Sequence, residues 1–381
     1  MTVLSDELLE RIRSRAAGYD RDNAFFQEDF DELVAVGYLR ALVPQEFGGL
    51  GLTLERAAAE QVRLGAAAPA TALAVNMHLV WTGVAKVLHE RGDASLDWLL
   101  EEAGAGEVFG FGISEAGNDL VLFGSRTDAQ PQPDGGYTFT GTKIFTSLSP
   151  AWTRLGTMGL DSTSADAPKI VYGFVERSEQ VTQRDDWDTL GMRASQSQST
   201  VLDGAFSPAN RIIRRLSPGP NPDPLIFAIF ANFEILLAAV YTGVGQRALE
   251  LAVEAAGRRT SLKNDGKSYA QDPDIRWRVA DAAIAQDGIP PQLFGLARDV
   301  DEQAAHGSQW FPKLVGLKIR ATENARYVVD QAIRVSGGGS YFAGNELGRL
   351  YRDVLAGIFH PSDAESAHNT VANAWLGPIT E

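Results

Sequence analysis

The sequence predicts an α+β protein in which helical and β segments are separated along the chain instead of alternating. The first hundred residues carry apolar stripes at helical spacing. Residues 109 to about 206 are rich in Gly, Thr, Ser and Asp and contain short β-type runs. Helical spacing then returns after a proline-rich stretch at 216–224. This order differs from the alternating pattern of a doubly wound Rossmann sheet, so a dinucleotide cofactor must be bound in another way.

Residues 1–108 are expected to form an N-terminal helical domain. Ser5 can cap a first helix, whose apolar stripe consists of Leu8, Leu9, Ile12 and Ala16. A loop rich in Pro and Gly follows at 44–49, and residues 52–88 are rich in Ala, Leu and Val, as expected for buried helices.

Residues 109–215 are expected to form a β domain. A turn signal at 134–136 precedes an alternating segment that starts at Tyr137, and two further strand-like runs lie at 170–172 and 200–202. The remaining residues, 216–381, are expected to form a second helical domain, with helical spacing over 233–251, 273–285, 311–335 and 363–376.

The composition restricts the partners. The chain has 34 basic and 49 acidic residues and a net charge of −15, which disfavours nucleic acids and membrane surfaces because both are negatively charged. It contains no cysteine, as is common in a reducing compartment, and its N-terminal residues show no signal-type apolar run. No uncharged run of about twenty apolar residues is present. We expect a soluble cytoplasmic protein, without a metal because no His, Asp and Glu set has metal-site spacing.

Five motifs resemble those of acyl-CoA dehydrogenases and occur in the same order. They are Pro44–Gly49, Ile113–Asp119, Gly141–Ser147, Leu190–Ser195, and Ser336–Tyr341 with the later pair Arg352-Asp353. The chain therefore resembles the acyl-CoA dehydrogenase superfamily over nearly its whole length. The resemblance implies an N-terminal helical domain, an antiparallel, barrel-like β domain and a C-terminal four-helix bundle. It also implies bound FAD, or FMN if the chain is similar to the flavin-dependent monooxygenases of this fold.

A flavin ring requires an apolar wall and a few hydroxyl or backbone donors along its polar edge. Ser114, Thr146 and Ser147 can supply these donors. By resemblance, Ser147 contacts the flavin near its reactive nitrogen, and Phe145 replaces a tryptophan that shields the ring. Alternatively, Phe145 is an ordinary inward-facing strand residue.

A second group of candidates concerns the cofactor pyrophosphate. A glycine run lets the backbone approach a phosphate closely, and the run here is Gly337, Gly338 and Gly339. By resemblance, Arg258 reaches the pyrophosphate of a neighbouring subunit's cofactor, although it could also be a solvated surface arginine. Because such sites are shared between subunits, the resemblance implies a homotetramer or a dimer.

The dehydrogenase base is absent from both of its usual places. An α,β-dehydrogenation needs a base at the α carbon, and this family uses a glutamate. In the segment after Arg352-Asp353 that place is occupied by His360 if one residue is deleted and by Pro361 if none is. On the helix after the linker it is occupied by Phe233, with Glu234 one position away. The candidate catalytic residues are therefore His360, Glu234 and Glu365.

Three functions remain open. The first is an FAD-dependent dehydrogenase acting on an acyl-CoA or related substrate, with an electron-transfer flavoprotein as partner. The second is a two-component flavin monooxygenase supplied by a flavin reductase, and the third is a non-enzymatic partner subunit of an active homologue. His78 and Arg193 are candidate substrate-binding residues, although His78 lies on an apolar helix and could be a core histidine.

Overall fold

The computed structural model describes residues 2–163 and 167–379. The first part of the chain is helical, as predicted. Ser5 caps the first helix by accepting a hydrogen bond from the Leu8 N–H group, and the predicted apolar stripe of this helix is buried. The helices are α1 (Asp6–Asp22), α2 (Gln27–Ala35), α3 (Leu54–Ala67), α4 (Pro69–Glu90) and α5 (Asp97–Ala105).

The middle of the chain forms a sheet. Within the described residues it has eight strands, with the order β6-β7-β3-β2-β4-β5-β8 and β1 paired to β4. Most neighbours are antiparallel, but β1 and β2 both run parallel to β4, so the sheet is mixed and not purely antiparallel as expected. The strands are β1 (Phe109–Gly112), β2 (Asp128–Pro131), β3 (Tyr137–Lys143), β4 (Arg154–Asp161), β5 (Lys169–Glu176), β6 (Val181–Gln183), β7 (Thr200–Ser207) and β8 (Ile212–Leu216).

The last part of the chain is helical again. Two helices were not predicted, α8 and α10. Helix α8 begins at Ile289 and continues through Pro290 and Pro291, because proline is tolerated in the first turn of a helix. The elements are α6 (Pro224–Arg258), α7 (Pro273–Asp287), α8 (Ile289–Asp301), α9 (Trp310–Ser336), α10 (Glu346–Val354) and α11 (Ala364–Leu376), with a small hairpin of β9 (Thr260–Ser261) and β10 (Lys267–Ser268).

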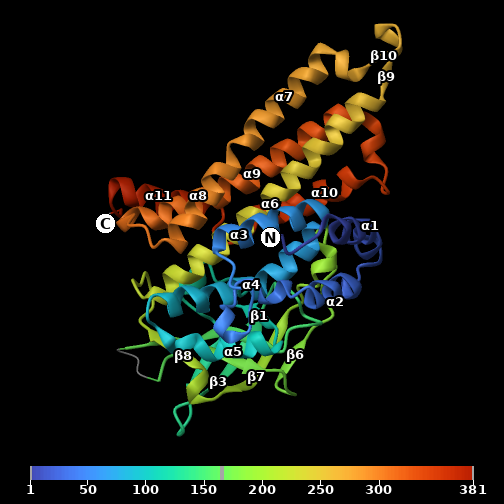
Figure 1. Ribbon diagram of the computed structural model, residues 1–381. Coiled ribbons are helices and arrows are strands. Elements are labelled where there is room, and N and C mark those ends of the chain that lie inside the picture. Colours follow the sequence, from blue (N-terminus) through green and yellow to red (C-terminus); the bar gives the residue numbers. More distant parts are fainter. Residues whose placement is uncertain (1, 164–166, 380–381) are drawn as a thin grey trace.

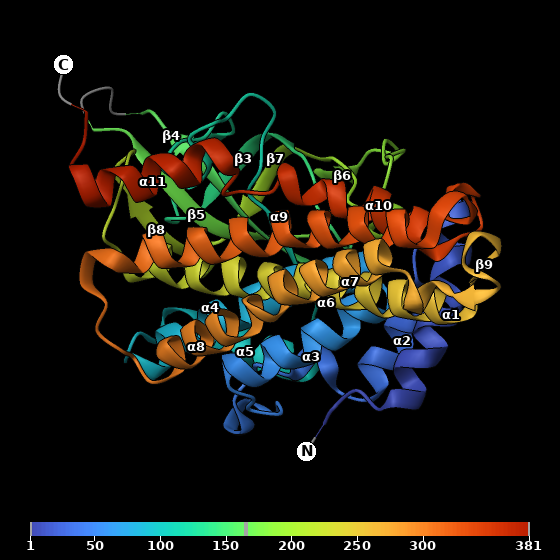
Figure 2. The same cartoon turned by 90° about the horizontal axis from the view of Figure 1, so that it is seen from above.

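Helix α6 is the central element of the fold. It packs against α9 on one side and against α3 and α4 on the other. In Figure 1 the sheet occupies one end of the molecule, while α6, α7 and α9 extend together toward the β9–β10 hairpin at the other end, and Figure 2 shows α6 running below α9. A Cβ atom at Gly243 would lie 2.2 Å from the Val62 carbonyl oxygen, so only glycine permits α6 to approach α3 this closely.

Two helices are long and apolar enough to cross a membrane by length and composition alone. They are α4 and α6, with mean hydropathies of 1.2 and 2.0 over their most apolar windows. These windows are 100% and 83% buried within the fold, as in core helices of soluble proteins.

Candidate active site

The turn after β3 carries three of the predicted cofactor-binding residues. The strand ends at Lys143, and the Ile144 N–H group donates to the Ser114 carbonyl oxygen at 2.9 Å. Phe145 and Leu148 then adopt left-handed conformations, with φ of 56° and 61°, which are unusual for bulky residues and concentrate at functional sites. Phe145 is therefore a turn residue with 54% of its surface exposed, and the interpretation of it as an inward-facing strand residue is wrong.

This turn presents hydroxyl groups beside an aromatic surface. Thr146 and Ser147 are buried, and Ser147 Oγ lies 2.7 Å from Ser197 Oγ. Among the described residues, Thr146 Oγ1 has no hydrogen-bond partner. The exposed ring of Phe145 meets the ring of Trp187 edge to face at 6.1 Å. A planar ring with a polar edge fits these residues, because one buried hydroxyl still lacks a partner and an aromatic side chain lies beside it.

A buried ion pair supports the turn. Lys143 Nζ donates to Glu115 Oε1 and to the Met158 carbonyl oxygen, both at 2.7 Å. Although burial alone would raise the pKa of Glu115, Lys143 and the surrounding donors lower this pKa to about 2. Glu115 lies next to Ser114, so the pair connects the 113–119 loop to β3. This pair was not predicted from the sequence, although Glu115 and Lys143 lie within the motifs at 113–119 and 141–147.

The segment that carries His360 lies between α6 and α9. His360 Nε2 lies 2.8 Å from the hydroxyl oxygen of Tyr241, which is fully buried on α6. Burial and the nearby charge of Lys318 lower the pKa of His360 to about 3, so its imidazole is neutral across the physiological range. A neutral imidazole with so low a pKa can form hydrogen bonds but binds a proton weakly.

The two carboxylates predicted as alternative bases are placed differently. Glu234 is buried on α6, and its Oε1 accepts hydrogen bonds from the Ser362 hydroxyl at 3.0 Å and from the Ser362 N–H group at 3.3 Å. Glu365 lies exposed in the first turn of α11 and does not join this cluster. Phe233 stacks on Phe111 at 5.6 Å between ring centroids, so an apolar ring occupies the second glutamate place.

His78 and Arg193 both make contacts within the fold. The Phe109 N–H group donates to His78 Nδ1 at 3.0 Å, so this imidazole must donate through Nε2 to the Leu39 carbonyl oxygen at 2.8 Å. Burial lowers the pKa of His78 to about 4. Both ring nitrogens are thus occupied in the core, whereas Arg193 donates to the Asp20 backbone at 2.9 Å and links the 190–195 turn to α1.

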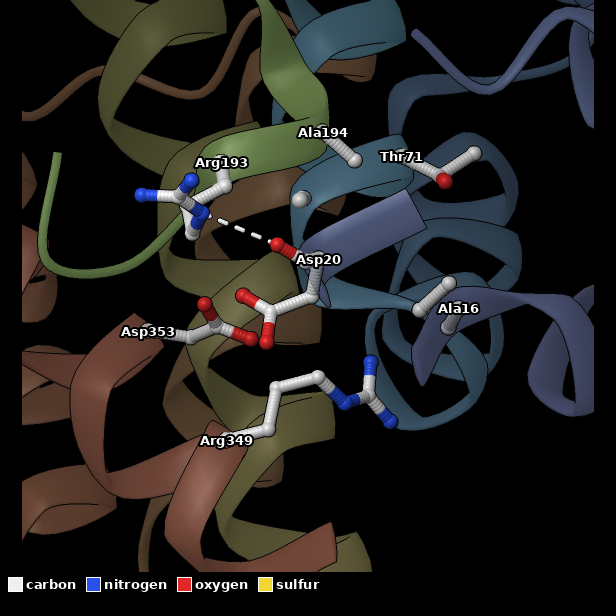
Figure 3. Close-up of a pocket in the computed structure, with 9 residues that line it drawn as sticks. Ala16, Asp20, Thr71, Arg193, Ala194, Arg349 and Asp353 are labelled. Carbon is white, nitrogen blue, oxygen red and sulfur yellow. Dashed lines mark hydrogen bonds between the residues drawn. The ribbon is translucent and has the colours of Figure 1, made fainter. Parts of the chain in front are cut away.

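A small cavity lies beside Arg193, at the junction of α1, α4 and α10 (Figure 3). Its volume of about 10 Å³ is near the minimum for one water molecule, so it is too small for a substrate. Asp353 accepts a hydrogen bond from the Met192 N–H group at 2.6 Å, and burial raises the pKa of Asp353 to about 6. A Cβ atom at Gly191 would lie 2.2 Å from the Arg352 carbonyl oxygen, so the 190–195 turn and the Arg352-Asp353 pair fit together structurally.

A larger cavity, of about 260 Å³, lies where α6 ends. Arg258 lines this cavity and is exposed, whereas Arg259 donates to the carbonyl oxygens of Val335 and Ser336. Ser336 Oγ is buried without a partner among the described residues. The glycine run at 337–339 borders the cavity, and Gly339 lines it. The cations Arg258 and Arg259 and an unpaired hydroxyl beside a glycine run can bind a phosphate group, while the carboxylates of Glu254 and Glu346 line the other part of the cavity. In the described ranges, no cluster of three or more His, Cys, Asp or Glu residues could bind a metal ion.

The turn after β3 and the helices that follow the sheet are typical of flavin-dependent oxidoreductases that bind their cofactor without a Rossmann sheet. Family models match at both ends of the chain: the acyl-CoA dehydrogenase N-terminal domain over residues 4–95, and the acyl-CoA dehydrogenase C-terminal domain over residues 235–362. The chain belongs to the acyl-CoA dehydrogenase family.

Its relatives include enzymes with a different chemistry. L-Evernosamine nitrososynthase from Micromonospora sp. is 29% identical over 92% of this chain and 84% of its own length. An amino sugar nitrososynthase from Streptomyces rubradiris is 28% identical over 94% of this chain and 85% of its own length. The solved structure of KijD3 in complex with FMN and dTDP-3-amino-2,3,6-trideoxy-4-keto-3-methyl-D-glucose is 28% identical, with a TM-score of 0.81 over 97% of this chain and 91% of that chain.

Proposed function

We propose that the protein is a flavin-dependent monooxygenase that oxidises an amino group of a small molecule, and not a dehydrogenase of acyl-CoA thioesters. One observation carries this proposal: neither of the family's two glutamate places presents a carboxylate base. His360 occupies the first place and is paired with Tyr241, and Phe233 occupies the second place and is stacked on Phe111. Removal of an α proton requires a competent base, whereas oxygen transfer to an amine nitrogen does not.

The turn after β3 and the cavity at the end of α6 would bind the two parts of the cofactor. Thr146 and Ser147 would bind the polar edge of the flavin ring, and Phe145 would cover part of its face. Arg258 and the 337–339 run would bind the pyrophosphate of FAD from a second copy of the chain, as in a homodimer or homotetramer. When bound, the reduced flavin supplies the electrons that activate O₂. FMN, which is present in the KijD3 complex, would bind only at the turn after β3.

The role of His360 follows from its protonation state. Because its pKa is held low, the imidazole stays neutral and cannot repel or protonate an incoming amine. With one ring nitrogen paired to Tyr241, the other can hydrogen-bond a substrate. We therefore assign His360 to orienting the amino group, while the lone pair of the unprotonated amine forms the bond to the transferred oxygen atom.

The substrate class that we propose is a nucleotide-linked amino sugar, because two relatives are named as nitrososynthases and the KijD3 complex contains such a compound. In this proposal a separate reductase supplies the reduced flavin in the cytoplasm. Each oxygen insertion consumes one O₂ and two electrons, forms an N–O bond and releases water.

One experiment distinguishes oxidation of an amine from dehydrogenation of an acyl-CoA thioester. The protein is mixed with flavin, a flavin reductase, NADH and O₂, together with a dTDP-linked amino sugar, and the product is analysed by mass spectrometry for an added oxygen on nitrogen. In parallel, the protein with oxidised flavin is mixed anaerobically with acyl-CoA thioesters of several lengths. We expect N-oxidation and no bleaching of the flavin. Bleaching by a thioester without any oxygenated product would refute the proposed function.

A further inference from the structure

We propose that Lys318 and Glu234 are positioning residues, which together fix the segment that carries His360 and so set the orientation of its imidazole. This segment, residues 357–362, is the His360 segment. The inference rests on the proposed function, since it concerns how His360 is aimed at the substrate.

Lys318 binds the His360 segment through three backbone carbonyl groups. Its Nζ donates to the oxygens of Gly357 at 3.2 Å, His360 at 2.7 Å and Ser362 at 2.7 Å. An ammonium group has three N–H donors, so this set uses all of them. The side chain is fully buried on α9, where a lysine is rare unless its charge is satisfied.

Glu234 binds the same segment from α6. Its Oε1 accepts from both the backbone and the hydroxyl of Ser362, while Lys318 binds the carbonyl oxygen of the same residue. Glu234 and Lys318 are 84 positions apart on two different helices, yet both contact Ser362. Every polar group of Ser362 is thereby bound by a buried ionisable side chain.

The contact between Tyr241 and His360 explains why the hydrogen bonds made by Lys318 and Glu234 affect the imidazole. Tyr241 lies seven positions after Glu234 on α6, which places both residues on one face of the helix. Tyr241 meets the imidazole at 2.8 Å, and Lys318 binds the carbonyl oxygen of His360 itself. The backbone and the ring of His360 are thus fixed from separate helices, and loss of Lys318 would leave His360 held by the contact of its ring with Tyr241.

The electrostatics agree with a locked arrangement. Burial raises the pKa of Glu234 and lowers the pKa of Lys318, and each opposes the shift of the other through its charge. Removal of either partner would leave the other buried without its compensating charge. The pair is therefore costly to keep in the core unless the geometry of the segment requires it.

Lys318→Met tests the proposal because it keeps the length of the side chain and removes the donors. Hydrogen exchange of the flavin-free protein, followed by mass spectrometry, should show roughly tenfold faster exchange in peptides covering 357–362, with α6 and α9 unchanged. In the oxygenation assay, kcat should fall about tenfold or more with little change in KM. Lys313→Met, at an exposed lysine on the same helix, is the matched control and should change neither readout.

A double variant tests whether Lys318 acts through His360. In a His360→Ala background, Lys318→Met should lower kcat by less than about twofold further, because coupled residues are not additive. A full additional loss, or unchanged exchange in the His360 segment, would overturn the inference. If Lys318→Met does not fold, Ser362→Ala removes only one bond to Glu234 and must still raise exchange locally. The hydrogen-exchange measurement does not depend on oxidation of an amine. It therefore tests the role of Lys318 even if the proposed function is wrong.

Discussion

At the scale of single residues, the site depends on buried polar side chains more than on exposed ones. Glu115 accepts hydrogen bonds from Ser125, Arg126 and Thr127 in addition to its pairing with Lys143. These donors surround a carboxylate that would otherwise be costly to bury. The loop that contains Ser114 is fixed by them before any cofactor binds.

Glu115→Gln should destabilise the protein by about 3 kcal/mol at pH 7, because Lys143 would lose its buried partner. The folded-state pKa of Glu115 is about 2, below its ordinary value of 4.5. Its contribution is therefore complete above about pH 4.5 and is lost as the pH falls toward 2. Urea unfolding of both proteins between pH 3 and 7 measures this difference, which should narrow on acidification. If the difference in unfolding free energy between the two proteins stays constant down to pH 3, Glu115 does not have this low pKa.

Ser147→Ala should weaken flavin binding by roughly twofold to tenfold, the effect of one lost hydrogen bond. Thr146→Val should weaken flavin binding to a similar extent. Its hydroxyl has no hydrogen-bond partner among the described residues, so the hydrogen bond that the substitution removes is the one proposed to the flavin. Fluorescence titration with FMN measures the Kd. Ser178→Ala, at an exposed position in the same part of the chain, is the control, and an equal loss of affinity there would argue against a specific role of the turn.

At the scale of elements, the segregation of helices and strands follows from local patterns. The stripe of α1 and the turn at 134–136 were correctly predicted because their signals are short-range. The mixed pairing of the sheet could not be predicted, since β1 and β4 are separated by more than forty residues and no local signal specifies their direction. The left-handed conformation of Phe145 could not be predicted from the sequence, because phenylalanine rarely adopts this conformation.

The contact between α3 and α6 provides a test at this scale. Gly243→Ala should destabilise the protein by about 2–3 kcal/mol, because the new methyl group would overlap the Val62 carbonyl oxygen. Gly257→Ala on the same helix meets no atom within 4 Å and should be neutral or should stabilise by about 0.5–1 kcal/mol. Thermal unfolding of the two variants should therefore give shifts of opposite sign. Equal shifts would show that the two helices do not pack as closely as described.

At the scale of the whole molecule, the candidate site is divided between distant parts of the chain. Local sequence patterns predict the glycine run and Arg258 as cofactor-binding residues, and the structure brings Arg258 and Gly339 to one cavity. They did not identify Tyr241 or Lys318, because these residues gain their meaning only when α6 and α9 meet the His360 segment. A lysine on an amphipathic helix does not by itself indicate a buried cation.

Arg258→Ala should discriminate between the two flavins. It should weaken FAD binding about tenfold, the loss of one hydrogen bond to a charged group, and leave FMN binding unchanged because FMN lacks the pyrophosphate. Isothermal titration with each flavin measures the affinities, and light scattering of the same samples gives the oligomeric state. Arg326→Ala, on the exposed face of α9, serves as control. Equal weakening for FMN and FAD would place the pyrophosphate elsewhere.

The guanidinium group of Arg352 on α10 pairs with the carboxylate of Asp20 on α1, and this contact has a consequence for the synthesis of the protein. It joins residues 332 positions apart at 2.9 Å, and Glu234 binds Ser362 across 128 positions. A growing chain leaves the ribosome N-terminus first, so α1 and the turn after β3 emerge long before α10 and the His360 segment exist. A polypeptide released before residue 350 would contain the turn after β3 without most of α10 and without the His360 segment. Truncated translation products are therefore expected to be inactive, and only the finished chain can assemble the site.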